Sequence, residues 1–333
     1  MYKLALGVLV FLTLACPATA KDRLHTVKTW MYQLQDLYEP GAWAALARTG
    51  YDMLVIEPGH NFAQWPYDTA TMLRVLRRKP DGGNRVLLAY IDIAEAEDYR
   101  DYWGPDWVAP RGNRPGTPDF LISEDPDGWA GNYPVAYWEP AWQHLWLGQT
   151  GIVADLARLG FDGIYLDWVE AYDDDAVRAA ARVARVSPEA EMIRFVERLG
   201  AAGRAVDRRF LVVAQNAPYL LDAAPIRYAA AIDGLAVEDT WFHGQGDRDW
   251  NDPRGGDRRD RHDGAYETAA RLAQIAKFRA RGLPVFSVDY AMKPANVALV
   301  YHEAPRHGLV PLVTRVALSR LTGTPPPWLD SDR

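Results

Sequence analysis

The sequence predicts an α/β fold in which eight parallel strands and eight helices form a barrel, and two observations lead to this prediction. Eight apolar, β-rich runs alternate with longer segments of helical period. The runs are almost continuously apolar, which is typical of strands buried on both faces. Strand and helix repeated eight times is the pattern of a (β/α)8, or TIM, barrel. At 333 residues the chain is long enough for one such barrel, which takes about 250 residues.

The predicted strands follow one another in a regular order. They are TWMYQL (29–34), YDMLVIEP (51–58), RVLLAYIDI (85–93), FDGIYLD (161–167), RFLVVAQN (209–216), IDGLAVED (232–239), LPVFSVDY (283–290) and HGLVPLVT (307–314). An open doubly wound sheet is the alternative fold. It is less favoured, because QLQDLYEPG, which follows the first strand, has no GxGxxG phosphate turn.

Amphipathic stretches between these runs predict the helices. They are GAWAALARTG (41–50), WQHLWLGQTGIVADLARLG (142–160), AAARVARVSPEAEMIRFVERLGAAGRA (179–205) and YETAARLAQIAKFRARG (266–282). Several end in glycine, the residue preferred just after a helix. The acidic run Asp173 to Asp175 is interpreted as the cap of a further helix, because it lacks the glycine and closing glutamate of a calcium loop.

The first twenty residues predict a signal peptide. MYKLALGVLVFLTLACPATA has one lysine, an apolar run of about a dozen residues and a small-x-small ending at Ala18 and Ala20. The run is shorter than the about 20 apolar residues of a membrane-spanning helix. We therefore expect a secreted or periplasmic protein, with a signal peptide over 1–20 and one barrel domain over 21–333. The alternative is a lipoprotein cleavage box that leaves Cys16 lipidated.

Two segments interrupt the alternation of strands and helices. Residues 101–140 are rich in proline, glycine and tryptophan, and residues 242–264 are rich in charge and glycine. Both follow predicted strand ends, and the loops after barrel strands form the face that carries active sites. We expect these segments to form walls or lids of a cleft, the alternative being surface insertions.

Charge and motif content exclude several function classes. The formal net charge of −7 argues against a nucleic-acid partner and leaves neutral or cationic ligands open. The seven histidines show no HExxH spacing, so a zinc site is not expected. The sequence also has no GxSxG, the nucleophile motif of α/β-hydrolases.

Polar residues fall at or just after the carboxyl ends of most predicted strands. They are Glu57, Asp92, Asp167, Asn216, Glu238 and Asp289. Parallel barrel strands bring these ends to one face. Carboxylates there are costly unless they are paired, cap helices or belong to a site that uses them. Six together favour a site.

Asp167 and Glu238 end the fourth and sixth strands and are the candidate catalytic pair. Glycosidic hydrolysis needs one carboxylate to attack or stabilise the anomeric centre and another to protonate the leaving oxygen and later activate water. Carboxyl groups about 5 to 5.5 Å apart retain anomeric configuration, and those roughly 6.5 to 9.5 Å apart invert it.

Aromatic residues near the strand ends are candidates for stacking on sugar faces. They are Tyr32, Tyr90, Trp138, Trp168, Tyr172 and Trp241, in a chain with 13 tryptophans. Most aromatic residues of a barrel fill its core, so we expect ligand contact chiefly from Trp138, Trp168 and Trp241.

Four motifs carry a resemblance to a known family. GFDGIYLDWVEAY, LLAYIDIAEAEDYR, YWEPAWQ and LAVEDTW resemble the exported barrel proteins of the endo-α-1,4-polygalactosaminidase family, glycoside hydrolase family 114, from residue 29 to about 320. The resemblance implies cofactor-free hydrolysis of α-1,4-linked galactosamine polymers such as galactosaminogalactan. It places the catalytic residues on Asp167 and Glu238 and, by analogy with retaining barrels, makes Asp167 the nucleophile and Glu238 the acid/base.

The third-strand motif departs from the family where Asp92-Ile93-Ala94 replaces the commoner Ser-x-Gly. Asp92 and Glu95 are candidates to bind the ammonium of a deacetylated amino sugar, in agreement with the acidic chain. For Glu95, Glu97 and Arg100 the alternative is an ion-pair network that holds the loop.

Three functions stay open at this point. The first is an exported glycosidase that acts within the chain of a polysaccharide, with no membrane span and no nucleic-acid partner. The second is a non-catalytic carbohydrate-binding barrel, accessory to polysaccharide handling. The third is a glycosidase for another polymer. The presence of both acids favours the first.

Overall fold

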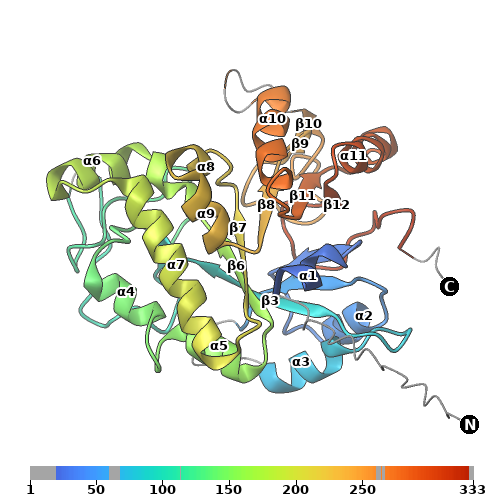
Figure 1. Ribbon diagram of the computed structural model, residues 1–333, viewed down its shortest axis with the longest axis horizontal. Coiled ribbons are helices and arrows are strands. Elements are labelled where there is room, and N and C mark those ends of the chain that lie inside the picture. Colours follow the sequence, from blue (N-terminus) through green and yellow to red (C-terminus); the bar gives the residue numbers. More distant parts are fainter. Residues whose placement is uncertain (1–19, 60–67, 113, 260–263, 265–266, 330–333) are drawn as a thin grey trace, which may run out of the picture.

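The computed structural model describes residues 20–59, 68–112, 114–259, 264 and 267–329, so nearly all of the predicted signal peptide lies outside the described residues. Eight parallel strands form the nearly closed barrel that the sequence predicts (Figure 1). They are β1 (Trp30–Gln33), β2 (Met53–Ile56), β3 (Val86–Asp92), β6 (Gly163–Asp167), β7 (Leu211–Gln215), β8 (Gly234–Glu238), β11 (Val285–Tyr290) and β12 (Val310–Thr314). Each lies inside one of the eight predicted runs.

The strands lie side by side in chain order, from β1 to β12. Between the two end strands, the indole N–H of Trp30 donates to the carbonyl of Val310 at 2.9 Å. The backbone N–H of Leu34 donates to the carbonyl of Leu318 at 2.9 Å just beyond them. The first and last strands, β1 and β12, are therefore held together by hydrogen bonds other than the regular strand-to-strand pairing of the sheet.

Helices connect and cover the strands. They are α1 (Ala20–His25), α2 (Ala42–Ala47), α3 (Thr69–Arg77), α4 (Pro140–Trp146), α5 (Ile152–Leu159), η1 (Val169–Asp173), α6 (Asp175–Ala184), α7 (Pro188–Val206), α8 (Leu220–Ala223), α9 (Pro225–Ala231), α10 (Thr268–Arg279) and α11 (Pro294–Arg306). Asp174 caps α6 by accepting a hydrogen bond from the N–H of Val177, as predicted for the acidic run. Such caps satisfy N–H groups that the helix leaves without an internal partner.

Two predicted helical stretches are each divided in the structure. The stretch 142–160 contains α4 and α5, which are separated at Gly148 and Gly151. The stretch 179–205 contains the end of α6 and most of α7, which starts afresh with Ser187 as cap and Pro188 in its first turn. Proline is favoured at the first helical position and cannot continue a helix from before it, which explains the second break.

Aromatic rings fill the barrel interior. Trp30 stacks on Tyr32 at 6.1 Å between ring centroids, and Tyr32 lies 5.2 Å from Tyr165. All three side chains are buried. Large rings give the interior a packed core, so the strands can present other side chains only at the barrel's ends.

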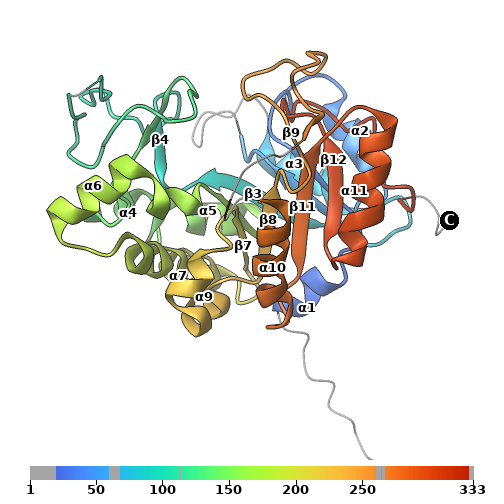
Figure 2. The same cartoon turned by 90° about the horizontal axis from the view of Figure 1, so that it is seen from above.

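The two predicted interrupting segments both stand on the carboxyl side of the barrel (Figure 2). β4 (Glu95–Glu97), just before the first segment, pairs antiparallel with β5 (Asn132–Pro134) inside it. The second contains β9 (Phe242–His243) paired antiparallel with β10 (Arg258–Arg259). The ring of Trp129 lies against Gly246, where an added Cβ would come 3.0 Å from it. The two segments therefore meet each other above the strand ends.

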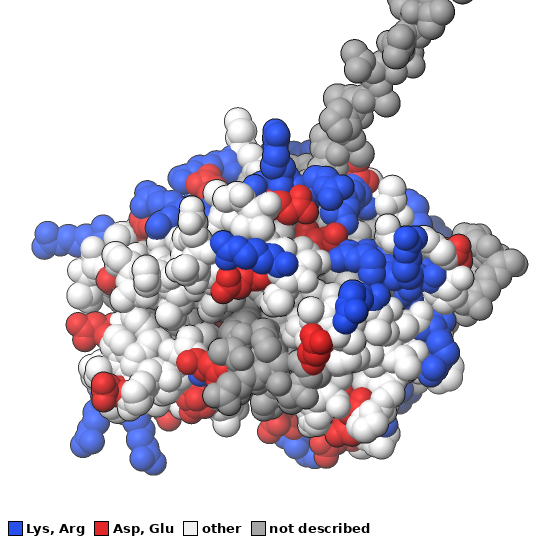
Figure 3. All heavy atoms as spheres, turned by 90° about the horizontal axis from the view of Figure 1, so that it is seen from below, with Lys and Arg blue, Asp and Glu red and all other residues white. Residues whose placement is uncertain are grey.

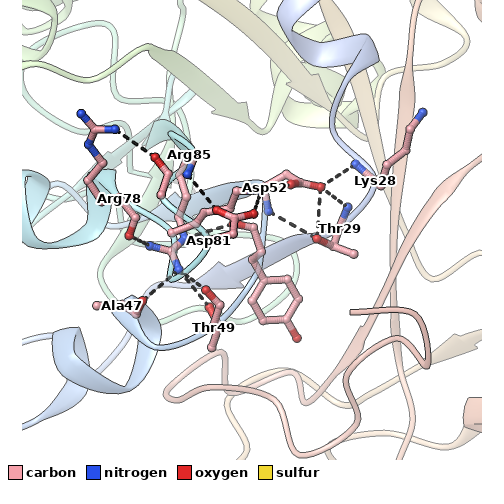
Figure 4. Close-up of polar contacts among 12 residues, drawn as sticks. Lys28, Thr29, Ala47, Thr49, Asp52, Arg78, Asp81 and Arg85 are labelled. Atoms are coloured by element: carbon pink, nitrogen blue, oxygen red, sulfur yellow. Dashed lines mark hydrogen bonds and ion pairs between the residues drawn. The ribbon is translucent and has the colours of Figure 1, made fainter. Parts of the chain in front are cut away.

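A polar network ties the amino end of the barrel together (Figure 4). Buried Arg85 donates to the carbonyls of Tyr51 at 3.0 Å, Leu76 at 2.8 Å and Ala47 at 3.1 Å. Asp52, just before β2, accepts from the N–H groups of Lys28 and Thr29. These contacts join β1, β2, α2 and α3 at the end where strands begin.

Candidate active site

A cleft of about 1180 Å³ opens over the carboxyl ends of the strands. Every barrel strand or the loop after it contributes to its lining, for example Tyr32, Glu57, Tyr90, Asp92, Asp167, Gln215, Glu238, Tyr290 and Ser319. The interrupting segments contribute Asp125, Trp129 and Asn132 on one side and Gly244 to Asn251 on the other. Their predicted role as walls of a cleft is confirmed.

Asp167 is the last residue of β6 and is fixed by two hydrogen bonds. The hydroxyl of Tyr90 donates to Oδ2 at 2.6 Å, and the N–H of Trp168 donates to Oδ1 at 2.8 Å. Burial raises the pKa of Asp167 to about 7, and the negative charge of Glu238 adds to this effect. A carboxyl group with this pKa can hold or release a proton near neutral pH.

Glu238 is the last residue of β8 and accepts from three side chains. Gln215 and Asn216 donate to Oε2, the latter at 2.8 Å, and the hydroxyl of Tyr290 donates to Oε1. The N–H of Glu238 donates back to Asn216 Oδ1 at 2.8 Å. Burial raises the pKa of Glu238, while the hydrogen bonds from Tyr290 and Asn216 favour the charged form and oppose that rise.

Asp167 and Glu238 therefore share one environment. Both line the cleft, both are held by neutral donors, and the charge on Glu238 raises the pKa of Asp167. Like charges close together make it costly to ionise both groups, so such a pair tends to hold one proton at neutral pH. One proton shared between two fixed carboxyl groups is what acid-assisted displacement at a sugar carbon requires.

Two further carboxyl groups lie at the end of β3 and just after it. Asp92 pairs in register with Asp167 on β6 and accepts from the N–H groups of Ala94 at 3.0 Å and Glu95 at 2.9 Å. Burial, then the charge of Asp167, raises the pKa of Asp92. Glu95 also lines the cleft and accepts from Asn132 Nδ2 at 3.1 Å. Both predicted ammonium-binding candidates thus reach the cleft.

Glu57 also reaches the cleft, but as part of an ion-pair network. Arg100 donates to Glu57 Oε1 at 2.8 Å and to Oε2 at 3.0 Å, and its Nε donates to Glu97 Oε2 at 2.7 Å. The pKa of Glu57 is raised to about 7 by burial, against the lowering effect of Arg100. The sequence suggested an ion-pair network of Glu95, Glu97 and Arg100 in this loop. The structure has such a network, but Glu57 takes the place of Glu95.

Four of the candidate binding residues lie outside the cleft lining: Trp138, Tyr172, Trp241 and Asp289. Asp289 is fully buried, at 0% exposure, and accepts from the N–H groups of Trp241 at 2.6 Å and Phe242 at 2.8 Å. It shapes the loop after β8. Trp241 is itself packed in the core, and Trp138 is half-buried edge-on against Tyr137. Strand-end position alone does not distinguish side chains that face the cleft from those that face the surrounding helices.

The structure adds site residues that the sequence did not single out. Gln215 and Tyr290 donate to Glu238, and the hydroxyl of Tyr32 donates to Gln215 Oε1 at 3.3 Å. Glu170, in η1, lines the cleft and has its pKa raised by burial and by Asp167. Gln215 ends β7 and Tyr290 ends β11. Because the ends of barrel strands face the site, their position in the sequence could have indicated both residues.

Charge distinguishes the cleft from the rest of the molecule. Among its described lining residues, thirteen are Asp or Glu and three are Arg. Arg100, one of the three, already pairs with Glu57 and Glu97.

In the described part of the chain, no cluster of three or more His, Cys, Asp or Glu is arranged to hold a metal ion. The same residues include no helix that is both apolar and long enough to cross a bilayer.

Two solved structures have similar folds. Ega3 from Aspergillus fumigatus, solved in complex with galactosamine, is 15% identical with a TM-score of 0.59, covering 90% of this chain and 95% of that one. The glycoside hydrolase domain of PelA from Pseudomonas aeruginosa is 14% identical with a TM-score of 0.56, covering 90% of this chain and 98% of that one. Both likenesses support the barrel fold.

Sequence relatives and a family profile extend the comparison. A protein of Deinococcus radiodurans is 31% identical over 306 residues, which is 92% of this chain and 86% of that protein. A protein of Thermotoga maritima is 28% identical over 86% of this chain and 80% of its own length. The profile of glycoside-hydrolase family GH114 matches residues 13–326. The chain therefore belongs to glycoside-hydrolase family GH114.

Proposed function

We propose that this protein is an endo-acting glycoside hydrolase that cleaves α-1,4-linked galactosamine-containing polysaccharide through Asp167 and Glu238. The observation that carries the proposal is the pair itself. Both carboxyl groups end barrel strands in one cleft, both have raised pKa values, and both are held by neutral donors. Membership of GH114 supports the class of reaction.

In the proposed retaining mechanism, Asp167 attacks the anomeric carbon while Glu238 gives its proton to the leaving oxygen. A covalent glycosyl-enzyme forms, and the shortened polymer leaves with the new hydroxyl. Glu238, now a carboxylate, takes a proton from water as that water attacks the same carbon and releases Asp167. The hydrogen bonds from Tyr90 and Trp168 keep the Asp167 carboxylate directed into the cleft.

The acidic cleft supports a cationic polymer as substrate. Its described lining residues include thirteen Asp or Glu and only three Arg, so a polymer with ammonium groups would lower the repulsion among the carboxylates. The similarity in fold to Ega3, which was solved with galactosamine, supports the same choice. We assign sugar binding to the cleft-lining residues Tyr32, Glu57, Tyr90, Asp92, Glu95, Trp168 and Asn216.

We further propose that the protein is exported after loss of residues 1–20, since that segment has the composition of a signal peptide. Sequencing the amino terminus of the protein recovered from the host's envelope and medium tests this. A new terminus at Lys21 supports cleavage there. If the amino terminus is a lipidated Cys16 instead, the protein is a lipoprotein anchored to the membrane.

The release of reducing ends from a galactosamine-rich polysaccharide tests the activity. The mature domain is compared with Asp167→Asn and Glu238→Gln at matched thermal stability. We expect the parent to cut and each variant to lose at least about a hundredfold, roughly 2.7 kcal/mol of transition-state stabilisation. A parent that binds without cutting would indicate a carbohydrate-binding barrel. Cleavage of neutral polymers alone would indicate a different substrate.

Azide rescue tests the two roles. Asp167→Ala removes the proposed nucleophile, so azide should attack from its side and give a glycosyl azide of inverted configuration. Glu238→Ala leaves the glycosyl-enzyme able to form from an activated aryl glycoside, so azide should then give the retained product. Exchanged stereochemistry between the two variants would reverse the assignment of roles.

A further inference from the structure

Two of the three arginines that line the cleft are not neutralised by a carboxylate. Arg100 pairs with Glu57 and Glu97. Arg248 and Arg320 form no ion pair with any residue that the structure describes. Arginine keeps its positive charge at every physiological pH. In a cleft whose described lining includes thirteen Asp or Glu, two cations that stay unpaired require an explanation.

The ring of Trp250 joins the loops that carry these arginines. The guanidinium carbon of Arg320 lies 5.3 Å from the centroid of this ring, and that of Arg315 lies 5.8 Å from it. Arg315 does not line the cleft and donates to the carbonyl of Ala291 at 2.6 Å. Trp250 and Arg320 both line the cleft. Two cations beside one ring repel each other, so an anion next to Arg320 would be stabilised by both.

Backbone hydrogen bonds fix both loops. The N–H of Val316, on the loop after β12, donates to the carbonyl of Gly255, on the loop after β8, at 3.2 Å. The N–H of Gln245 donates to the carbonyl of Arg254 at 2.8 Å and closes the part of the loop that carries Arg248. Side chains held on fixed loops lose less conformational freedom when they bind a ligand, which favours a binding role for the unpaired arginines.

Arg248 also has an N–H group that lacks an acceptor. Its Nε is buried and has no hydrogen-bond partner among the described residues. Asp247 and Asp249 flank it in the sequence, but both are exposed and, within the described part of the chain, neither forms an ion pair with it. Asp252, four residues later, is paired with Arg254 at 2.6 Å. A buried N–H without an acceptor is costly, so Arg248 is a donor available to a ligand in the cleft.

We propose that Arg248 and Arg320 form an oxyanion-binding subsite, which takes the carboxylate or phosphate group of an acidic polysaccharide. The N–H groups of a guanidinium form a fork that matches the oxygens of these anions. This inference goes beyond the proposed function, which concerns the bond that is cut and not the charged groups elsewhere on the polymer. The subsite would make the cleft selective for polymers that carry an anionic sugar or substituent.

The subsite lies across the barrel from the carboxyl groups at and after β3. In the order of the eight strands, β3 and β11 are four positions apart, so they lie on opposite sides of the barrel. The loop with Arg248 follows β8 and the loop with Arg320 follows β12, which are the two neighbours of β11. An oxyanion bound by these arginines would consequently lie on the wall away from Asp92 and Glu95.

Calorimetric titration with trigalacturonate tests the subsite, and the fully methyl-esterified trisaccharide is the matched neutral ligand. Both are titrated into protein carrying Asp167→Asn, so that cleavage cannot alter the ligand. We expect the acid to bind at least about tenfold more tightly than the ester at low salt, and this preference to shrink as salt is added. Arg248→Gln and Arg320→Gln, at matched melting temperatures, should each remove the preference. Arg254→Gln removes an exposed arginine of the same loop that is paired with Asp252, and should keep it.

Inorganic phosphate separates a free anion from one carried on a sugar. If phosphate binds through Arg248 and Arg320 while the acid and the ester bind alike, the subsite takes free oxyanions and its assignment to an acidic polysaccharide is overturned. If neither phosphate nor trigalacturonate binding depends on these arginines, or if Arg254→Gln loses as much as Arg320→Gln, the subsite itself is overturned. A parent that cuts no galactosamine-rich polymer would overturn the proposed function alone, because the titrations do not depend on cleavage.

Discussion

The two ends of the barrel use carboxylate side chains in opposite ways. At the amino end, Asp52, Asp162 and Asp233 directly precede β2, β6 and β8, and each pairs with a cation: Lys79, Arg77 with Arg23, and Arg204. At the carboxyl end, Asp92, Asp167 and Glu238 end β3, β6 and β8 and are held by N–H, amide and hydroxyl donors. Carboxylates thus connect elements through ion pairs at one end, and at the other they form the proposed catalytic site.

Surface charge follows this division. In the view from below, Lys and Arg side chains gather over the upper part of the face, toward the end where the strands begin (Figure 3). The cleft at the opposite end is lined by thirteen carboxylates and three arginines. A carboxylate beside cations is stabilised as the anion, whereas a buried one beside other carboxylates resists ionisation. We therefore expect the amino end to contribute to stability and the carboxyl end to give up some stability for the proposed chemistry.

The largest expected effect would come from Arg85→Met at the amino end. This change leaves several buried carbonyls, including those of Tyr51 and Leu76, without a donor. We expect a loss of about 3 to 5 kcal/mol in the free energy of unfolding, measured by denaturant titration. Arg158→Met, at an exposed i,i+3 pair with Asp155, is the control and should change it by less than about 0.5 kcal/mol. If Arg85→Met and Arg158→Met lowered the free energy of unfolding by similar amounts, the network at the amino end would not be a special source of stability.

Two matched substitutions, one just before β6 and one at its end, test whether the two ends of the barrel differ in this way. Asp162→Asn, before the strand, should cost about 2 to 3 kcal/mol of stability, because it weakens pairing with Arg23 and Arg77. Reducing-end release should stay close to that of the parent. Asp167→Asn, at the strand's other end, should abolish cleavage while the melting temperature stays equal or rises. An unstable Asp167→Asn protein, or an inactive Asp162→Asn protein, would contradict the division.

The pH dependence of unfolding should come mainly from the carboxyl end. Burial raises the pKa of Asp167 from 3.8 to about 7 and that of Glu57 from 4.5 to about 7. At a pH between the unfolded pKa values, near 4, and the folded ones, about 7, the folded protein keeps protons that the unfolded chain has lost. Stability therefore falls as pH rises from about 4 to 7. Asp167→Asn should make this fall shallower in melting curves recorded across that range. An unchanged slope would show that Asp167 ionises in the folded protein as it does in the unfolded chain.

The sequence predicted the fold well because its signals are local. Each of the eight apolar runs contains a barrel strand, and the acidic run before α6 caps that helix. Gly148 and Pro188, where the helices break, are also present in the sequence. The helical spacing of apolar residues continues on both sides of each, so each stretch was predicted as one continuous helix. Local pattern therefore located the elements better than their exact ends.

The candidate site was harder to predict, because it depends on the direction in which each side chain points. Asp289 and Glu238 both occur at strand ends, yet Glu238 lines the cleft and Asp289 binds the backbone of Trp241 and Phe242. The hydrogen bond from Asn132 to Glu95 joins residues 37 positions apart through the β4–β5 hairpin, which no spacing rule indicates. Arg100 similarly joins Glu57 from a different loop.

The smallest expected effect concerns the neutral donors that distinguish the carboxyl end. Tyr90→Phe removes the hydroxyl that donates to Asp167 Oδ2 at 2.6 Å and that lowers the pKa of Asp167. Without it, the pKa of Asp167 should rise further, and the acidic limb of the pH–rate profile should move upward by about one unit, with about a tenfold loss of kcat at pH 6. Tyr228→Phe, at a buried hydroxyl away from the cleft lining, should leave the profile unchanged. If Tyr90→Phe lowered activity equally at every pH, the hydroxyl would position Asp167 without setting its protonation, and the neutral donors would serve geometry alone.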